Sequence, residues 1–493
     1  MKPQIEKLPV CKRVFLGECR TVAEVQMVAR ENENIHVLSI SADANILSCE
    51  SLSGEVLFDG RLTAKAIIKD DDGNLASLSY NVDFADRLKN NGITADVKVQ
   101  LDAVVENVDF NVQGNVIYAK CVVATSGCAF VCDEQDVVTD CDGLQTKKQT
   151  VATSKNVCFI KKDFSVVDEV ELRQSVSKIL LAQTNGVVSS VKCEQDVLSV
   201  KGDFFTCVTC VRDDGQICSV TIQTPFEEEF SAQNCNDDCI ATCVVKTKNT
   251  KVRMEMQNDS TNEFSLEISA ELCANVFDVQ NADVVSDAFS KQFNIDLAEQ
   301  KVQVCMPGKY VTHLCSADGV VDQKDVDEVL CLANAKAGIV SQVLAGGVLS
   351  LQGVVCADLL FVSEEKVVSS PLQIPFETKV QTGCNFVCEV SNVCVTQTSA
   401  KVVRGAVSVD FGLKFGINCF DCNKFAFVAG ITMLDKKTDD DCAIEVFVGK
   451  KGMTSWDVQK RLGMGYDDLL ACNPGLTLPL ENDQKIVVYR KIE

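Results

Sequence analysis

The sequence predicts a mainly β protein, in which three tandem strand-rich units, each a sandwich or barrel, precede a small β-α-α-β module. Three observations favour this fold class. The stretch at residues 52–88 returns in similar form at 197–230 and 348–380. Each copy alternates apolar and polar residues on both sides of a polar turn, which is the pattern of a β-hairpin. The end of the chain instead carries helix-start and helix-stop signals. The length of 493 residues agrees with three or four domains of about 100–200 residues each.

The three copies share a glycine, a polar turn and a phenylalanine. The glycines are Gly60, Gly202 and Gly353, the turns are Asp71-Asp72-Gly73, Asp213-Asp214-Gly215 and Glu364-Glu365-Lys366, and the phenylalanines are Phe84, Phe226 and Phe376. Each phenylalanine follows its glycine by 24, 24 and 23 residues, respectively. Glycine in the first two turns supplies a positive φ at little steric cost. The third turn ends in lysine instead, so it must use another geometry.

The units are predicted to span residues 14–140, 164–290 and 315–435, with a lead-in at 1–13 and more polar connections at 141–163 and 291–314. The matching sequences Asp168-Glu169-Val170 and Asp327-Glu328-Val329 precede the second and third copies, and a mixed segment with helical character is expected there. The aligned glycines lie 142 and 151 residues apart, a period too long for a solenoid. The repeats therefore indicate domains in tandem, whose strand order the pattern leaves open.

The C-terminal module is predicted to begin near residue 443, where the charge distribution changes. Residues 445–493 hold seven acidic and seven basic side chains, so the formal charge of −23 belongs to the rest of the chain. A strand at 445–448 leads to Thr454, which is placed to cap a helix ending at Leu462. A second helix at 467–472 stops at Asn473-Pro474-Gly475, and a strand at 485–489 follows.

Net charge and hydropathy exclude several classes of function. A charge of −23 argues against nucleic acid and anionic lipid as partners, and it serves solubility. No apolar run reaches the ~18 residues of a membrane-spanning helix. Near the N-terminus, Pro3, Glu6, Lys7 and Pro9 interrupt the apolar core that a signal peptide needs. We therefore expect a cytoplasmic protein without a transmembrane segment.

No copy offers a set of catalytic residues, and we expect no enzyme activity, cofactor or metal. His36 and His313 are not at equivalent positions, so neither belongs to a shared site. Nucleotide-binding and nucleophile-elbow motifs are missing from the sequence, and the acidic turns are expected to be solvated. The 27 cysteines mostly fall in strand-like runs, where a reduced thiol packs as a small hydrophobe. Two alternatives stay open: zinc held by the pairs Cys207/Cys210 and Cys419/Cys422, and later oxidation that cross-links exposed thiols to neighbours.

The C-terminal module resembles a LysM domain through Trp456, Leu462, Asp468-Leu469-Leu470 and Asn473-Pro474. The resemblance implies a binding surface for a glycan or a protein, made by two loops. Its residues are Gly452, Met453, Thr454, Ser455, Trp456, Asn473, Pro474, Gly475 and Leu476. LysM domains usually bind glycans that contain N-acetylglucosamine, with an acidic residue where Met453 stands here. The apolar replacement favours an exposed contact with a protein. Trp456 is either part of the module's core or a partly exposed anchor.

The three strand-rich units resemble the SPOCS domain, through the hairpin with its final phenylalanine, which Pro225 and Pro375 precede in the second and third copies. Tandem SPOCS domains before a C-terminal LysM domain are similar to a family of spore-coat morphogenetic proteins. The resemblance implies a non-enzymatic scaffold in the mother-cell cytoplasm, at the surface of the forespore. There the LysM domain would dock on the ATPase that polymerises as the basement layer of the coat, and other coat proteins would be further partners. The alternative is a LysM protein that binds peptidoglycan or chitin.

Overall fold

The structure is a computed structural model, and it describes residues 2–29, 34–254, 261–323, 325–437 and 444–489. Strands dominate these residues, and the described helices lie near the C-terminal end. The predicted mainly β class is confirmed. Residue 443, the expected start of the C-terminal module, and residues 490–493 at its end lie outside the described residues.

The first strand set forms two sheets, with strand orders β2-β3-β4 and β1-β6-β5. Its strands are β1 (Pro3–Val28), β2 (Ile35–Leu52), β3 (Glu55–Asp70), β4 (Leu75–Lys89), β5 (Val99–Gln113) and β6 (Val116–Cys141). Neighbouring strands are antiparallel throughout. One apolar cluster, which includes Leu62, Phe84 and Val123, takes side chains from both sheets and so forms the core between them.

The second strand set repeats this pairing within one five-stranded sheet, in the order β10-β11-β7-β8-β9. Its strands are β7 (Gln145–Glu194), β8 (Val197–Arg212), β9 (Ile217–Ser231), β10 (Ile240–Met254) and β11 (Thr261–Phe289). The 50-residue β7 pairs with β11 up to Val176 and with β8 from Val176 onward. It therefore supplies both the strand that corresponds to β1 and the strand that corresponds to β2.

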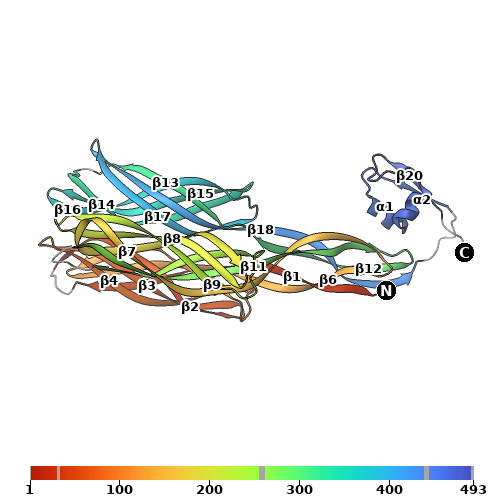
Figure 1. Ribbon diagram of the computed structural model, residues 1–493, viewed down its shortest axis with the longest axis horizontal. Coiled ribbons are helices and arrows are strands. Elements are labelled where there is room, and N and C mark those ends of the chain that lie inside the picture. Colours follow the sequence, from red (N-terminus) through yellow and green to blue (C-terminus); the bar gives the residue numbers. More distant parts are fainter. Residues whose placement is uncertain (1, 30–33, 255–260, 324, 438–443, 490–493) are drawn as a thin grey trace.

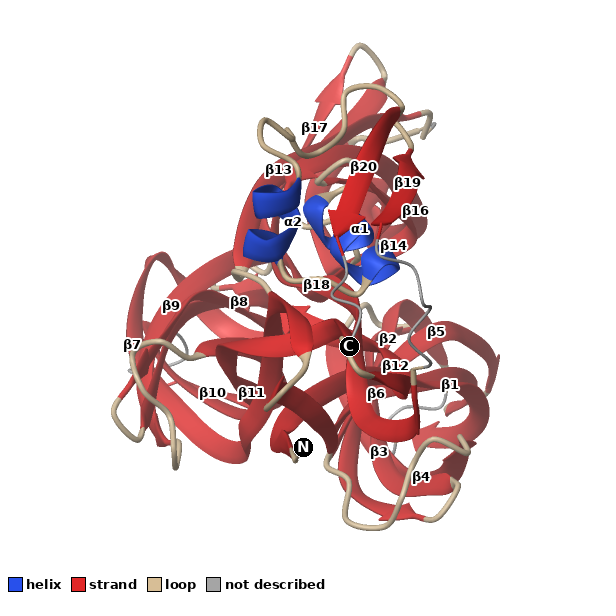
Figure 2. Ribbon diagram, turned by 90° about the vertical axis from the view of Figure 1, so that its right-hand side faces the viewer, coloured by secondary structure: helices blue, strands red, loops and turns tan. Residues whose placement is uncertain are grey.

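The third strand set has one sheet in the order β14-β15-β16 and another in which β12, β13 and β17 all pair with β18. Its strands are β12 (Phe293–Pro307), β13 (Val311–Val321), β14 (Glu328–Ala345), β15 (Val348–Ser363), β16 (Lys366–Gln381), β17 (Val387–Val403) and β18 (Ala406–Lys436). Its core, like that of the first set, lies between the two sheets. Viewed along the long axis, the three sets form three lobes around that axis (Figure 2).

The central hairpins explain the spacing of the repeated pattern of glycine and phenylalanine. Gly60 lies opposite Phe84, Gly202 opposite Phe226 and Gly353 opposite Phe376. The first two hairpins turn through three residues that end in Gly73 (φ 88°) and Gly215 (φ 84°). The third turns through two residues, Glu364 and Glu365, both with positive φ. This is the geometry of a type I′ turn, and the shorter turn accounts for the spacing of 23 instead of 24 residues.

The lead-in and the two polar connections expected from the sequence are strands. Residues 3–13 belong to β1, residues 145–163 to β7, and residues 293–307 to β12. The segment Asp168-Glu169-Val170 also lies in β7, so the helical character expected there is wrong. These segments form strands because each pairs with a distant partner, as β1 does with the far end of β6. In these segments, buried residues alternate with polar residues that face solvent, so the average composition of each segment is polar.

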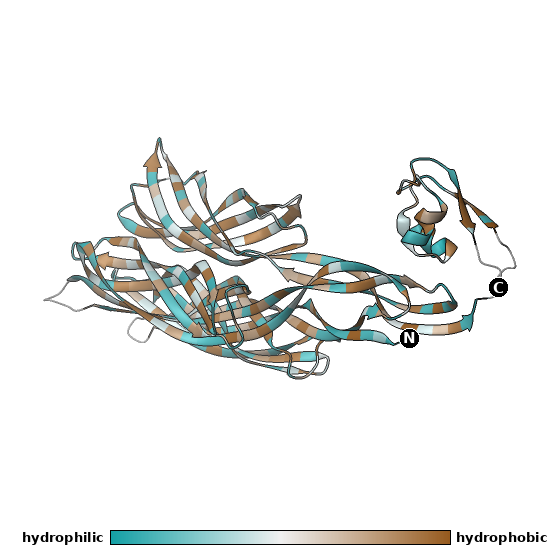
Figure 3. Ribbon diagram, turned by 45° about the vertical axis from the view of Figure 1, so that its right-hand side comes forward, coloured by the Kyte–Doolittle hydropathy of each residue, from teal (hydrophilic) through white to brown (hydrophobic). Residues whose placement is uncertain are grey.

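The ends of six strands extend beyond the lobes as a narrower bundle, which we call the stalk (right-hand part of Figure 1). It contains the start of β1, β7 and β12 and the end of β6, β11 and β18, paired as β1-β6, β7-β11 and β12-β18. Two small apolar clusters fill it, around Val138 and Val285 and around Leu8 and Phe427. Hydrophobic and hydrophilic residues alternate along the strands of the lobes and the stalk alike (Figure 3).

The C-terminal module comprises β19 (Ile444–Gly449), α1 (Ser455–Leu462), α2 (Tyr466–Cys472) and β20 (Gln484–Tyr489). The predicted element order and approximate boundaries are observed. The two strands pair in antiparallel fashion, and α1 and α2 pack with them around a core that includes Val458, Leu469 and Ile486. In the described part of the chain, no helix is long enough to cross a bilayer.

Candidate functional site: the C-terminal module and the junction of the strand sets

The first predicted binding loop is held by the start of α1. Thr454 and Asp457 form a reciprocal capping box, in which the Thr454 backbone N–H donates to the Asp457 carboxylate (2.8 Å). Gly452, with φ 88°, and Thr454 are exposed. Met453 instead packs against the module's own core, and its carbonyl accepts a hydrogen bond from the Leu480 N–H (3.0 Å). Met453 is therefore half-buried, because the loop turns this side chain towards the core, and its predicted contact with a protein stays a prediction.

The second predicted loop has two residues that bind within the module and two exposed ones. The Asn473 side chain joins the end of α2 to β20, since its amide donates to the Val487 carbonyl (2.8 Å) and its oxygen accepts from the Val487 N–H (2.8 Å). Pro474 and Gly475 are exposed, and Leu476 packs against the module's core. Ser455, in the first loop, accepts a hydrogen bond from Gln459 (2.6 Å). Binding by either loop stays a prediction.

Trp456 contacts the tip of the stalk, a role that the sequence did not suggest. Its ring packs edge-on against Phe289, with the centroids 5.2 Å apart, and its indole N–H donates to Asp287 (2.8 Å). Lys460, one turn later on α1, also binds the Asp287 carboxylate (2.7 Å). A second ion pair joins Lys291 to Asp468 of α2 (2.8 Å). The local sequence carries no signal for these contacts, because they join residues more than 160 positions apart.

The outer face of the β19-β20 sheet carries several exposed apolar side chains. Val446, Val448 and Tyr489 lie on it with 54%, 49% and 61% of their surface accessible. The register of the two strands places all three on one face, because Ile444 is opposite Tyr489 and side chains alternate along a strand. The other face covers the module's core through Phe447, Ile486 and Val488. Adjacent exposed apolar side chains on a small domain are typical of a protein-binding surface.

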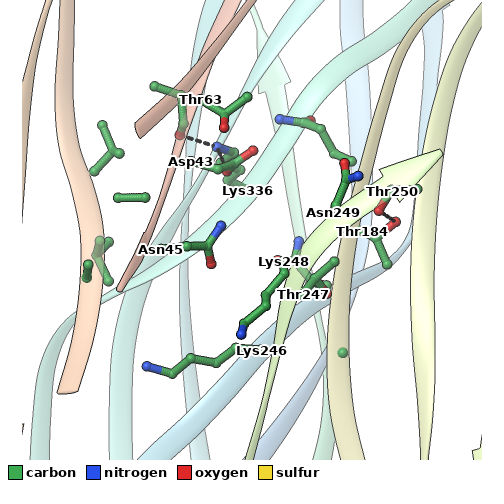
Figure 4. Close-up of a pocket in the computed structure, with 18 of the residues that line it drawn as sticks. Asp43, Asn45, Thr63, Thr184, Lys246, Thr247, Lys248, Asn249, Thr250 and Lys336 are labelled. Carbon is green, nitrogen blue, oxygen red and sulfur yellow. Dashed lines mark hydrogen bonds and ion pairs between the residues drawn. The ribbon is translucent and has the colours of Figure 1, made fainter. Parts of the chain in front are cut away.

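A cavity of about 670 Å³ lies where the three strand sets meet, and it is lined by residues of β2, β5, β7, β10, β14 and β17 among others. Figure 4 shows Lys246 and Lys248 projecting from β10, and Lys336 of β14 beside Asp43 of β2. Lys336 binds Asp43 at 2.6 Å, and Lys246 binds Asp102 of β5 at 2.8 Å. Both ion pairs therefore cross from one strand set to another.

The lysines of this cavity bind carboxylates or a backbone carbonyl. Burial opposes ionisation of Asp43, but the charge and hydrogen bond of Lys336 and the charge of Lys65 together outweigh it and lower the pKa of the carboxyl group. Lys248 bridges Asp163 (2.7 Å) and Glu271 (2.9 Å). Burial lowers the pKa of Lys65, whose ammonium group donates to the Ala182 carbonyl (3.0 Å) across the same junction. The contacts of Lys336, Lys246 and Lys65 cross between strand sets and so position the sets relative to one another.

The histidines and cysteines also lie in structural settings. His313 hydrogen-bonds Thr378 (2.7 Å), and His36 lies 3.5 Å from Asp71. Within the described residues, no three His, Cys, Asp or Glu side chains are grouped as metal ligands would be. Cys210 and Cys419, from the two pairs with zinc-ligand spacing, instead lie opposite Cys218 and Cys388 on neighbouring strands.

Comparison with known families gives one match, which falls in the first strand set. Residues 35–113 match the family model described as SipL, SPOCS domain. The matched segment begins with β2 and ends with β5, so it covers the central hairpin and the strand that follows. It does not reach the second and third strand sets or the C-terminal module. Comparisons with curated proteins and with solved structures gave no match.

Proposed function

We propose that this protein is a non-enzymatic scaffold of the endospore coat, which acts in the mother cell at the forespore surface. The SPOCS match at residues 35–113 supports a role in sporulation. The shared pairing of glycine and phenylalanine in β3-β4, β8-β9 and β15-β16 supports three SPOCS domains in tandem. The β-α-α-β order and the capped first helix support a LysM domain after them. In this proposal the strand sets contact other coat proteins, and the LysM domain docks on the basement-layer ATPase.

The exposed apolar face of β19-β20 carries the docking part of the proposal. Val446, Val448 and Tyr489 present apolar surface that a protein partner would remove from water. This face lies opposite the module's own core, while Trp456 is engaged by the stalk. Because the basement layer is a polymer, several weak contacts along it would retain the scaffold without any single tight site.

Co-sedimentation of the full chain with the polymerised ATPase tests the docking surface. The double variant Val446→Lys/Val448→Lys should bind at least about tenfold more weakly, because two charged groups would have to be desolvated at the interface. Val320→Lys is the matched control, since Val320 lies in a strand of the third set and is 74% exposed. Unchanged Trp456 fluorescence would show that the double variant keeps its fold. Wild-type binding by that folded variant would exclude this face as the docking surface.

The exposed loop residues favour a second candidate, a protein that binds peptidoglycan or chitin. Gly452, Thr454, Pro474 and Gly475 are accessible in the two loops that LysM domains use for glycans. Pelleting of the full chain with purified peptidoglycan distinguishes the two candidates. Strong retention that soluble N-acetylglucosamine oligomers abolish would favour this alternative. Retention no greater than that of an unrelated acidic protein would leave the coat scaffold as the better proposal.

A further inference from the structure

Four pairs of cysteines lie directly opposite each other on neighbouring antiparallel strands. They are Cys11 and Cys132 on β1-β6, Cys210 and Cys218 on β8-β9, Cys305 and Cys422 on β12-β18, and Cys388 and Cys419 on β17-β18. Residues that face each other in this way project to the same side of the sheet. Their Cα atoms are about 4.5 or 5.5 Å apart, depending on the kind of pair. A disulfide accepts Cα separations of about 4.4–6.8 Å, so the ladder itself meets the requirement.

In three of these pairs the sulfur atoms are already close. The Sγ atoms are 2.9 Å apart in Cys11 and Cys132, 3.4 Å in Cys210 and Cys218, and 3.5 Å in Cys388 and Cys419. All six cysteines are reduced in this structure. Forming the bond therefore requires only small movements of side chains and leaves the strand register unchanged.

The pairs differ in their access to solvent. Cys132 is exposed and Cys218 is half-buried, so a small reagent can reach one member of each of these pairs. Cys388 and Cys419 are only 4% and 1% exposed. The last pair has a similar sulfur separation but no accessible member, and it serves as a control within the same molecule.

We propose that Cys11/Cys132 and Cys210/Cys218 are sites of disulfide formation that react with low-molecular-weight disulfides such as oxidised glutathione. The thiolate of Cys132 attacks one sulfur of the reagent, which releases one glutathione thiolate and leaves a mixed disulfide on Cys132. Cys11 then loses its proton and attacks the Cys132 sulfur, which releases the second glutathione. Two protein thiols lose two electrons and two protons, and the reagent gains them as two glutathione thiols. Cys218 and Cys210 react in the same order.

Hydrogen bonding within each pair favours this order of attack. The two sulfur atoms of Cys11 and Cys132 are hydrogen-bonded, and this contact with Cys11 lowers the pKa of the Cys132 thiol to about 7, although burial opposes the shift. The same contact with Cys210 lowers the pKa of Cys218 to about 7. The accessible member of each pair is thus the one with the larger thiolate fraction, and the thiolate is the attacking form.

The two disulfides would have different consequences for stability. Cys11 and Cys132 are 121 positions apart, so their bond would fasten the first strand of the chain to β6 across a long loop. Cys210 and Cys218 are 8 positions apart and would close only a hairpin. The first disulfide should therefore raise the midpoint of thermal unfolding more than the second, since constraint of the unfolded chain grows with loop length.

To test the proposal, the folded full chain is treated with oxidised glutathione, the remaining thiols are blocked, and the disulfides are mapped by mass spectrometry. Peptides that link Cys11 to Cys132 and Cys210 to Cys218 are expected, and Cys388 and Cys419 should be blocked only after denaturation. Cys11→Ser should leave glutathione on Cys132. The exposed-site variant Cys132→Ser, which spares the buried cysteine, should instead leave Cys11 reduced.

Three results would overturn the proposal, which does not depend on the proposed function. One is glutathione that remains on Cys132 and Cys218 of the wild type without internal disulfides. Another is disulfide-linked dimers as the main product on non-reducing gels. The third is oxidation of Cys388 and Cys419 as fast as that of the accessible pairs.

Discussion

Three phenylalanine rings lie over strand glycines because those positions have no Cβ. A Cβ added at Gly60 would lie only 2.3 Å from the ring of Phe84. A Cβ added at Gly202 would lie 2.5 Å from the ring of Phe226, and one added at Gly353 would lie 2.4 Å from the ring of Phe376. At Gly202 and Gly353 it would also meet a backbone oxygen of the adjacent strand, at 2.4 Å and 2.3 Å. The side chain of each phenylalanine can then cover the backbone and reach the core of its strand set.

Alanine at these glycines should destabilise the fold. We expect Gly202→Ala and Gly353→Ala to lower the free energy of unfolding by about 1–3 kcal/mol, because the backbone oxygens cannot move aside without breaking the ladder. Urea unfolding followed by circular dichroism measures the effect. Gly338→Ala is the matched control, since a Cβ there would meet no atom within 4 Å. Equal losses in the control and in the two variants would contradict this explanation.

The ion pair between Lys414 and Asp203 joins the third strand set to the second. The two groups are 2.7 Å apart, with 15% of each side chain exposed. Burial would raise the pKa of Asp203, but hydrogen bonds from Lys414, Gln223 and Ser189 outweigh it and hold the pKa below its usual range. Since the folded pKa lies below the unfolded value of about 3.9, the pair contributes full stability above that pH. Its contribution is lost as the pH falls through the folded pKa.

Asp203→Asn should therefore cost stability at neutral pH and much less in acid. We expect a loss of about 1.5–3 kcal/mol at pH 7, where Lys414 would be left without its charged partner. The difference from the wild type should shrink as the pH falls below about 4. Unfolding midpoints measured between neutral and acidic pH give the loss of stability at pH 7 and its decrease in acid. A loss that does not change with pH would show that the stabilisation by Asp203 does not depend on its charge.

The sequence reveals elements that form through local contacts, but it does not reveal strands that depend on pairing with distant residues. The hairpins β3-β4, β8-β9 and β15-β16 and the capped helix α1 form through neighbouring residues, and all were predicted near their observed positions. The stalk strands were missed, because β1 and the first part of β7 pair with residues more than 80 positions away. Met453 was expected to be exposed, since a loop pattern does not show which way a side chain turns. The partners of Trp456 follow only from the tertiary fold.

Removal of the stalk contacts should release the C-terminal module from the stalk. Trp456 is the only tryptophan of the chain, so no other tryptophan contributes to the fluorescence that reports this contact. In Asp287→Asn and Phe289→Ala, the emission should shift to longer wavelength and iodide should quench it more strongly, because the indole gains water as a neighbour. Asp283→Asn is the control, since Asp283 lies on the same strand and binds Thr150 instead. Spectra that match the wild type in all three variants would mean that the contact does not form in solution.

At the scale of the whole molecule, the strand sets are joined into one body. Lys336, Lys246 and Lys414 each bind a carboxylate of another strand set. A further apolar cluster, which includes Leu38, Leu181 and Leu360, takes residues from all three sets. The strand sets should therefore unfold together, although their sequences repeat.

The C-terminal module should unfold separately and before this body. Its own core has six buried apolar residues (Val458, Leu462, Leu469, Leu480, Ile486 and Val488), and domains of this size are marginally stable. In a urea titration, Trp456 fluorescence should change at lower denaturant than the strand signal of circular dichroism. Asp287→Asn should move only the fluorescence transition to still lower urea, because the stalk contact stabilises the module and not the lobes. Coincident transitions in both proteins would show instead that the module and the strand sets form a single cooperative unit, and the module could then not dock on a partner independently of the lobes.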